Sequence, residues 1–378
     1  MPHHDDPIRD LIVRTFGPGT DTIAHEAVDS EWAPVERWRL HSDHHEVPHT
    51  VVIKTRRANG SGWGYDPRNL VAERRALDLL APTGLVPHIY AADDALGAIV
   101  MEDIAGASTV ERMLFGTDPA LAHDGLVRLA TALGTMHAAT TPIDPTPWHP
   151  ASILMTPLPD AWSTLTQAIS HLGLPGFGKA AIEIEDLASS LTDPAWWALT
   201  HADANPSNVL VAGDRIALID FEGANPRHIG IDGGGFALGF PAYRYWADLP
   251  EKTIAAMTDA WRTALLPGFP TVADDAVYVP MLATGVLAWT ILRLTRLPLI
   301  ADNGQPPDET HRRRTQIVRT IDLAVATCRT GTTYPAITNW LGTLDDALRQ
   351  RWPEASNPRH YPAFNGGSRE GWIVFHGI

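Results

Sequence analysis

Short apolar runs rich in β-branched residues dominate the first hundred positions and predict strands. They span residues 23–28, 35–40, 50–55, 87–92 and 97–101. Helical spacing predicts a short amphipathic helix at 7–16, and Asp66-Pro67 begins another at 68–80, because Asp suits the N-cap and Pro the first helical position. The core of this part is therefore predicted to be a five-stranded antiparallel sheet that carries one helix, 68–80.

From residue 108 onward the apolar positions recur at helical spacing. The predicted helices include 119–140, two within 159–192, and 274–297, 308–329 and 334–352. Ala276 to Leu292 is mostly apolar, but it is short for a membrane span and is predicted to be a buried core helix. The pattern indicates an α+β protein with a small antiparallel lobe followed by a large, mainly helical lobe.

Within the second part of the chain, residues 199–223 combine polar side chains with two short apolar strands. His201 and Asp203 begin a loop that Asn208 ends, strand 209–211 follows, and strand 216–219 ends on Asp220. A hairpin with a two-residue turn brings Asn208 and Asp220 together. Amide and carboxylate oxygens suit Mg²⁺, which binds few protein ligands and completes its octahedron with phosphate oxygens and water.

These residues carry a resemblance to a known superfamily. The spacing His201-x-Asp203-x4-Asn208, followed by Asp220-Phe221-Glu222, resembles the catalytic loop and metal motif of protein-kinase-like enzymes. It is most similar to the aminoglycoside phosphotransferase branch with its choline-kinase relatives. Ala202 stands where that branch usually has Gly and protein kinases have Arg. The resemblance implies a two-lobed protein-kinase-like fold and an ATP- and Mg²⁺-dependent kinase of a small-molecule hydroxyl.

The resemblance also implies roles for particular residues. Asp203 would orient the acceptor hydroxyl and accept its proton, whereas Asn208 and Asp220 would bind Mg²⁺. Lys54, at the end of a predicted strand, would hold the nucleotide phosphates and pair with Glu73 on the following helix. Taken alone, an edge-strand lysine and a helix glutamate are usually solvated. Their order along the chain favours the functional interpretation.

The remaining nucleotide contacts are predicted from position in the chain. Ser30, in the turn at 29–34, is a candidate for the phosphate-covering loop, although no Gly-x-Gly-x-x-Gly is present. A hinge at 103–107 would separate an N-terminal lobe, 1–102, from a C-terminal lobe, 108–378. Glu102 and Ile104 would present backbone to the adenine, and Met101 with Ile53 would sandwich the ring, as apolar walls do in nucleotide pockets. An ordinary interdomain linker remains the alternative.

Charge and composition narrow the partners. The 378 residues carry a net charge of -15, which disfavours nucleic acid and anionic membranes and favours a cationic acceptor. A single cysteine, Cys328, rules out an intrachain disulfide and fits a reducing cytoplasm. A monomer or a homodimer is expected. Together with Glu222, the acidic balance favours an aminoglycoside or amino sugar. Neutral sugars, choline-like alcohols and amino-acid alcohols remain open, as does ATP against GTP.

Several other patterns carry alternatives. The His-rich turn at 41–49 is predicted to be an exposed hairpin tip rather than a zinc site, because nothing signals a second ligand pair. Asp232 is predicted to anchor the catalytic loop, as the resemblance implies, and residues 233–235, three glycines, to allow close helix packing or a flexible turn. Residues 312–314, three arginines, are predicted to form a solvated helix face.

Other functional classes are less consistent with these residues. A metal-dependent hydrolase would need more histidines near the site. A non-catalytic pseudokinase would be expected to lack one of the motif residues, whereas all are present. Protein kinase activity is disfavoured by Ala202 and by the lack of an Ala-Pro-Glu segment after Asp220.

Overall fold

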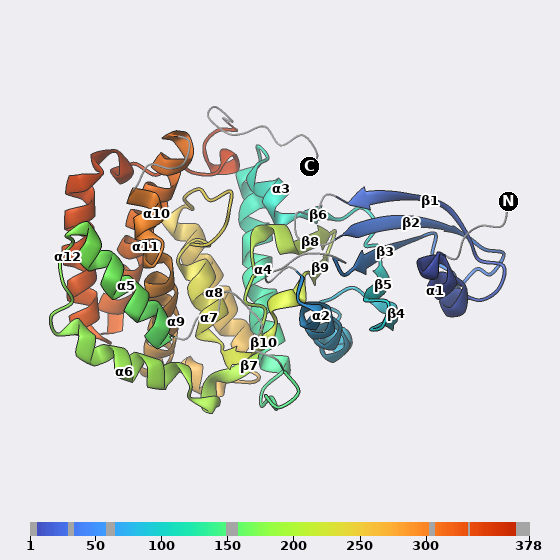
Figure 1. Ribbon diagram of the computed structural model, residues 1–378, viewed down its shortest axis with the longest axis horizontal. Coiled ribbons are helices and arrows are strands. Elements are labelled where there is room, and N and C mark those ends of the chain that lie inside the picture. Colours follow the sequence, from blue (N-terminus) through green and yellow to red (C-terminus); the bar gives the residue numbers. More distant parts are fainter. Residues whose placement is uncertain are drawn as a thin grey trace.

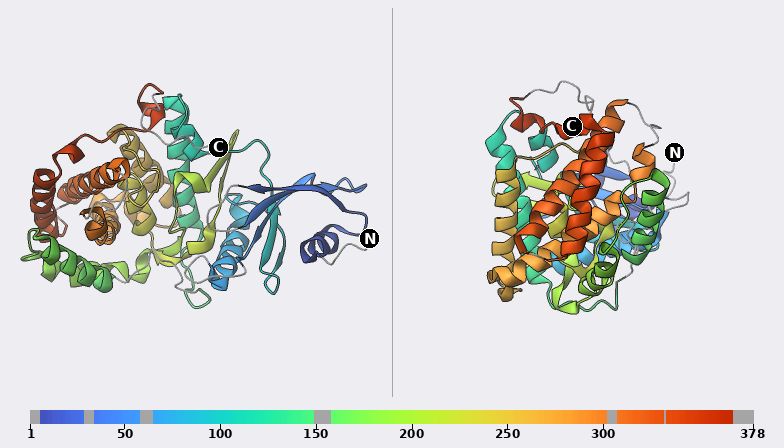
Figure 2. Two further views of the ribbon diagram at one scale, coloured as in Figure 1. Left: turned by 45° about the horizontal axis from the view of Figure 1, so that its top comes forward. Right: turned by 90° about the vertical axis from the view of Figure 1, so that its left-hand side faces the viewer.

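The computed structural model describes residues 6–28, 34–57, 65–148, 158–301, 307–331 and 333–367. A small lobe built on a β-sheet stands beside a larger lobe built of helices, and the N-terminal end of the chain lies at the far end of the small lobe (Figure 1). The right-hand view of Figure 2 places the C-terminal helices in front and the sheet behind them. The two-lobed α+β architecture agrees with the prediction.

The sheet of the small lobe is antiparallel, with the order β1-β2-β3-β5-β4. Its strands are β1 Asp21–Val28, β2 Val35–His41, β3 Thr50–Thr55, β4 Ile89–Asp93 and β5 Ala98–Glu102. Residues directly opposite one another in neighbouring strands share a face, and alternate residues face opposite ways. Because Lys54 lies opposite Ile99 and Val52 opposite Met101, Lys54 and Met101 share one face.

The other face of the sheet packs on α1, Pro7–Phe16. Ile53 belongs to the apolar cluster on this face together with Leu11, Ile12 and Trp38. The expectation that Ile53 lines the nucleotide pocket is therefore wrong, because the alternation of the strand turns it away from Lys54. The lobe thus carries α1 on one face in addition to α2, Pro67–Leu80, whose Glu73 meets Lys54.

The helices begin where the sequence predicts. Asp66 caps α2 by accepting from the N–H of Arg68, with Pro67 in the first turn. In the large lobe the helices are α3 Val110–Leu114, α4 Pro119–Ala139, α5 Leu158–Leu172, α6 Ala180–Leu191, α7 Gly230–Ala237, α8 Glu251–Leu265, α9 Asp275–Leu294, α10 Leu297–Ala301, α11 Pro307–Gly331 and α12 Pro335–Arg351. Their apolar side chains form one continuous core.

Helix α9 lies at the centre of this core and packs against α5, α7 and α11. It is the one helix of the described segments that is long and apolar enough to cross a membrane, yet 72% of its apolar window is buried inside the protein. This agrees with the buried core helix predicted for residues 276–292. Because its neighbours already cover the apolar side chains, packing within the lobe accounts for the hydropathy.

Glycines let α7 and α9 approach closely. A Cβ on Gly285 would lie 1.7 Å from the carbonyl oxygen of Gly230, and a Cβ on Gly234 would lie 2.6 Å from the backbone of Gly285. No larger residue fits without moving a helix. Gly233, where a Cβ would lie 2.6 Å from the Trp261 ring, and Gly234 therefore serve close helix packing, one of the two alternatives that the sequence left open, whereas a Cβ on Gly235 would make only ordinary contacts.

Two small sheets position the polar loop between the lobes. In one, β8 Val209–Ala212 and β9 Arg215–Leu218 form the predicted hairpin, and β6 Ser108–Thr109 pairs with β8. In the other, β7 Trp197–Thr200 pairs with β10 Asn225–His228. Residues 201–208 therefore span from the end of β7 to the start of the hairpin.

Candidate active site

The loop that begins at His201 is fixed by Asp232 on α7. The Asp232 carboxylate accepts from the backbone N–H of His201 at 2.7 Å and of Ala202 at 2.9 Å, and it lies 3.1 Å from Nε2 of His137. Ala202 has a φ of +66°, which costs a non-glycine residue about 1–2 kcal/mol. The hydrogen bonds hold this left-handed residue in place. The positive φ explains why the branch that the motif resembles usually has a glycine there.

Replacing Asp232 with alanine should destabilise the protein. The change leaves two buried N–H groups of the loop without an acceptor, and each such group costs about 1–3 kcal/mol. We expect the free energy of unfolding to fall by about 2–5 kcal/mol in a denaturant titration. Asp214→Ala, an exposed carboxylate in the turn of the β8–β9 hairpin, is the matched control and should change the midpoint little. Equal midpoints for the Asp232 variant and the parent would contradict the anchoring role.

Within the loop, Asp203 is held by two amides. Nδ2 of Asn205 donates to one carboxylate oxygen of Asp203, and Nδ2 of Asn208 donates to the other at 3.2 Å. Burial, followed by the negative charge of Asp220, raises the pKa of Asp203 to about 7. A carboxyl group with a pKa near neutrality is well matched to accepting a proton from a hydroxyl.

His201 supports the same loop. Its ring lies 3.0 Å from the carbonyl oxygen of Ile219 through Nε2, so Nε2 is the donor, and it packs on Phe221 with ring centroids 4.4 Å apart. Burial lowers the pKa of His201, which keeps the ring neutral at neutral pH. The side chain ties the loop to the residue that follows β9.

Lys54 lies at the centre of three carboxylates. Its Nζ is 2.7 Å from Glu73, 2.6 Å from Asp220 and 2.8 Å from Glu222, and its side chain is 7% exposed. Burial disfavours the ammonium, but the charges of Asp220, Glu73 and Glu222 outweigh it and raise the pKa of Lys54 well above its usual value. The predicted pair of Lys54 and Glu73 is therefore formed, within a larger ionic cluster.

The carboxylates of this cluster outnumber its one ammonium. Oxygens of Glu73, Asp220 and Glu222 lie within 4.8 Å of one another, so the cluster carries an excess of negative charge when all three are ionised. Burial raises the pKa of Glu73 to about 7, which relieves part of that excess. Hard oxygen ligands with surplus negative charge are the donor set that Mg²⁺ requires. The residues present therefore fit a divalent cation.

Sequence reasoning placed Asn208 and Asp220 on the cation but gave Glu222 no such place. The backbone carbonyl of Asn208 accepts from the N–H of Ile219 at 3.0 Å, which sets Asn208 beside Asp220. Asp220 has a φ of +67°, a conformation that Asp tolerates better than most residues. The turn brings the Glu222 carboxylate back onto Lys54. An acidic residue two positions after Asp220 was the available signal.

Replacing Lys54 with methionine should destabilise the protein and weaken nucleotide binding. The variant leaves the buried carboxylates of Glu73 and Glu222 and the half-buried one of Asp220 without a cation, and breaking a buried pair in this way costs about 3–5 kcal/mol. We expect Mg²⁺ to raise the melting temperature of the variant more than that of the parent, because the ion replaces the lost positive charge. Lys252→Met, on the exposed side of α8, is the control. A variant that is as stable as the parent without Mg²⁺ would argue against this charge balance.

At the predicted hinge, side chains link the lobes. Arg215 of β9 donates through Nη2 to Glu102 at 2.7 Å and through Nη1 to the other carboxylate oxygen. Arg37 of β2 makes a second two-pronged contact, with Asp103, at 2.8 and 3.2 Å. The N–H of Glu102 already donates to the carbonyl of His88 at 2.8 Å. The side chain of Glu102 therefore joins the lobes through Arg215, whereas its backbone N–H is used within the small lobe.

The other predicted nucleotide residues lie in different places. Met101 is buried on the same face of the sheet as Lys54, and Ile104 is buried two residues beyond the end of β5. The carbonyl of Ile104 accepts from the N–H of Ala107 at 3.2 Å in the turn that follows. Ser30 lies outside the described residues. Lys54, Glu73 and Asp220 converge, whereas Met101 and Ile104 lie farther along β5 and the hinge.

A narrow hollow adjoins Asp203. Its innermost volume of about 20 Å³ has room for one water molecule. Besides Asp203 and Asn205, the lining residues include Phe236 of α7, Phe240 in the loop that follows, and Trp289 of α9. A hydroxyl that entered here would meet the Asp203 carboxylate. Much of the aromatic stretch at 240–246 is buried in the core.

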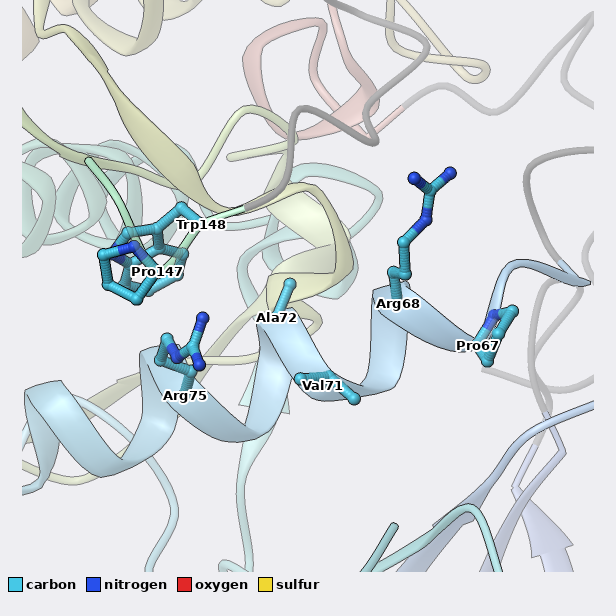
Figure 3. A pocket seen from close by; sticks show the side chains of 7 residues that line it. All are labelled: Pro67, Arg68, Val71, Ala72, Arg75, Pro147 and Trp148. Atoms are coloured by element: carbon cyan, nitrogen blue, oxygen red, sulfur yellow. The ribbon is translucent and has the colours of Figure 1, made fainter. Parts of the chain in front are cut away.

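A larger hollow of about 160 Å³ lies elsewhere, between α2 and residues 147–148. Arg68, Val71 and Arg75 approach it from α2, and Trp148 faces them (Figure 3). The Arg75 guanidinium lies 5.7 Å from the centre of the Trp148 ring. None of the predicted site residues lines this hollow, so size alone does not locate the active site.

Comparison with known proteins identifies the family of this chain. Residues 33–273 match the profile of the phosphotransferase enzyme family, which covers more than half of the chain. The chain belongs to this family and is a small-molecule kinase. No curated protein sequence matches it.

Solved structures of similar proteins support the fold. Choline kinase from Cryptosporidium parvum Iowa II is 16% identical with a TM-score of 0.53, and the match covers 89% of this chain and 100% of that chain. A choline/ethanolamine kinase family protein from Mesorhizobium loti is 18% identical, with a TM-score of 0.49 and coverage of 90% and 99%. An ADP-bound aminoglycoside phosphotransferase is 12% identical, with a TM-score of 0.44 and coverage of 88% and 99%. The first of these places the chain in the kinase-like fold.

Proposed function

We propose that this enzyme transfers the γ-phosphoryl group of ATP to a hydroxyl of a small molecule, with Asp203 as the catalytic base. The observation that carries the proposal is that Asp203 and the Lys54 cluster lie at the two ends of one loop and hairpin. Asp203 faces a hollow in the helical lobe, whereas Asp220 and Glu222 meet the lysine of the sheet lobe. Phosphoryl transfer requires this division, an acceptor on one side and phosphates on the other.

In the proposed reaction the acceptor oxygen forms a bond to the γ-phosphorus while the bond to the bridging oxygen of ADP breaks. The Asp203 carboxylate orients the hydroxyl and takes its proton late in the transfer. Lys54 turns its ammonium to the phosphates while Glu73 retains it. Asn208, Asp220 and Glu222 would hold the divalent cation, which supplies positive charge to the phosphate oxygens.

The proposal assigns the nucleotide to the lobe of residues 1–102 and the acceptor to residues 108–378, with the hinge at 103–107. Met101 would contact the adenine from the face of the sheet that bears Lys54. Ile104 would add apolar surface and backbone groups at the hinge. The two-pronged pairs of Arg215 with Glu102 and of Arg37 with Asp103 support a hinge whose backbone is held in one orientation.

The expected acceptor class, an aminoglycoside or amino sugar, loses part of its support. It rested on the net charge of -15 and on Glu222. Because Glu222 pairs with Lys54 at 2.8 Å, its carboxylate belongs with the phosphates rather than with an amine of the acceptor. Long-range attraction by the acidic chain is the remaining support. Amine-bearing acceptors are therefore one of the acceptor classes to be tested.

The test is a coupled assay of ADP release with Mg-ATP against amino sugars, aminoglycosides, neutral sugars, amino alcohols and sugar acids. We expect turnover on one of these classes that disappears in Asp203→Ala. Mg-ATP binding, measured by calorimetry, should persist in that variant because Asp203 lies on the acceptor side. A parent protein that neither binds Mg-ATP nor releases ADP would refute the proposed function.

A further inference from the structure

A group of arginines surrounds one buried glutamine in the helical lobe. Oε1 of Gln316 on α11 accepts from Nη2 of Arg293 on α9 at 3.1 Å and from Nη1 of Arg313 on α11 at 3.2 Å. Gln316 is fully buried. We call these three residues and the neighbouring Arg244, Arg296 and Arg312 the arginine cluster. It corrects the prediction for residues 312–314, which are partly buried and paired rather than freely solvated.

The arginine cluster has an excess of positive charge. Burial, followed by the charges of Arg313 and Arg296, lowers the pKa of Arg293 to about 9. Burial and the charges of Arg312 and Arg244 likewise lower the pKa of Arg313. Among the described acidic residues, the one paired with Arg312 and Arg313 is Glu309, at the long distances of 3.8 and 3.7 Å. Several arginines thus lie close together in a chain with 44 acidic and 29 basic residues.

Buried donors in the arginine cluster also lack acceptors. Nε of Arg293, Nε of Arg312 and Nε2 of Gln316 are all buried, and none has a hydrogen-bond partner. Each is a donor that can be satisfied only by an acceptor, and an unmet buried donor costs about 1–3 kcal/mol. A carboxylate or phosphate group supplies several acceptors together with the missing negative charge.

Two elements connect the arginine cluster with the hollow at Asp203. Trp289 lines that hollow, and Arg293 follows it by four residues on α9. Residues four apart on a helix are neighbours on one face, about 6 Å apart along the axis. The loop after α7 makes a second connection. It contributes Phe240 to the lining of the hollow, and its Arg244 is close enough for its charge to lower the pKa of Arg313. Figure 1 shows α7, α9 and α11 side by side in the helical lobe.

We propose that the arginine cluster binds an anionic group of the acceptor, a carboxylate or a phosphate monoester, while the acceptor hydroxyl lies at Asp203. This rests on the proposed function and specifies the substrate class of the same site. Arg293 and Arg313 would be specificity-determining residues. An acidic chain would repel such an acceptor at long range. The cluster overcomes this repulsion locally through short charge-assisted hydrogen bonds.

Binding of a probe anion tests the arginine cluster without any turnover. Sulfate is titrated by calorimetry into the full chain saturated with Mg-ADP, which occupies the phosphate positions near Lys54. We expect Arg293→Gln and Arg313→Gln to weaken sulfate binding about 10- to 100-fold, the effect of losing a charged hydrogen bond. Arg314→Gln is the matched control, because Arg314 is the next residue on α11 and pairs with Glu354 at 3.1 Å. Sulfate binding that is absent, or unchanged in both variants, would overturn the inference.

Measurement of turnover with four related acceptors is the second test of the arginine cluster. Glucose, glucosamine, gluconate and glucose 6-phosphate share a hydroxylated carbon chain and differ in the charged group, so ADP release on each separates neutral, cationic, carboxylate and phosphate acceptors. We expect release with one of the anionic pair, and an increase in KM of about 10- to 100-fold in Arg293→Gln. Release with glucosamine alone would refute the anionic acceptor and leave the phosphotransferase proposal standing. Failure of Mg-ATP binding would instead refute the proposed function.

Discussion

Alanine in place of Asp203 should reduce kcat about 10²- to 10⁴-fold, the usual contribution of a positioned base. Asp203 lines the hollow of the helical lobe, and the two amides of Asn205 and Asn208 fix the direction of its carboxylate. Burial and the charge of Asp220 raise its pKa to about 7, so the folded protein holds this carboxylate at a cost. Removing it should leave the melting temperature unchanged or higher.

The measurement is steady-state ADP release together with calorimetric binding of Mg-ATP. We expect the variant to bind Mg-ATP as the parent does and to fail in transfer. Asp214→Ala serves as the control because Asp214 lies exposed in the hairpin turn that follows the same loop. If Asp203→Ala turned over within a few-fold of the parent, a different group would have to accept the proton, and the assignment of the acceptor side would be lost.

Asparagine in place of Asp220 should reduce kcat about 10²- to 10³-fold or more and raise the Mg²⁺ concentration needed for half-maximal activity. Asp220 contributes a carboxylate to the cluster within 4.8 Å of Glu73 and Glu222. Asparagine tolerates the φ of +67° at this position and keeps the shape of the side chain. Lys54 would retain Glu73 and Glu222 as partners, so the fold should survive.

Activity measured against Mg²⁺ concentration distinguishes a ligand from a merely structural carboxylate. A structural role would shift the thermal midpoint and leave the Mg²⁺ dependence unchanged. A ligand role shifts the Mg²⁺ dependence with little change in the midpoint. Asp214→Asn is the matched control from the same hairpin. Normal turnover of Asp220→Asn at the Mg²⁺ concentration that suits the parent would exclude Asp220 from the cation.

The part of the site that is local in sequence was predictable. Asp203, Asn208 and Asp220 lie on one loop and one hairpin, and the turn at residues 213–214 fixes how the strands pair. The alternation of polar and apolar residues therefore determined which side chains meet. The predicted helix at 68–80 and strand at 50–55 likewise placed Glu73 and Lys54 within reach of each other, because order and length restrict how a strand and the next helix pack.

Other features depended on contacts between distant segments. Ile53 was expected in the nucleotide pocket, but the pairing of β3 with β5 and the packing of α1 turned it to the opposite face. Glu222 was interpreted as a residue for the acceptor, whereas the turn after Asp220 directs it to Lys54. For Ile53, a shift of one position along the strand decides which face of the sheet the side chain joins. For Glu222, the turn after Asp220 decides whether the carboxylate meets Lys54 or the acceptor.

The residue pattern was sufficient for the two kinds of lobe, the loop of Asp203 and the order of the motif residues, because each depends on periodicity or on neighbours in the chain. The arginine cluster required the folded chain. Its members come from α9 and the residues just after it, from α11 and from the loop after α7, and the close approach of α7 to α9 depends on Gly234 and Gly285. Which charges share one buried environment is set by helix packing, since side chains that are far apart in sequence interact strongly only when the core excludes water between them.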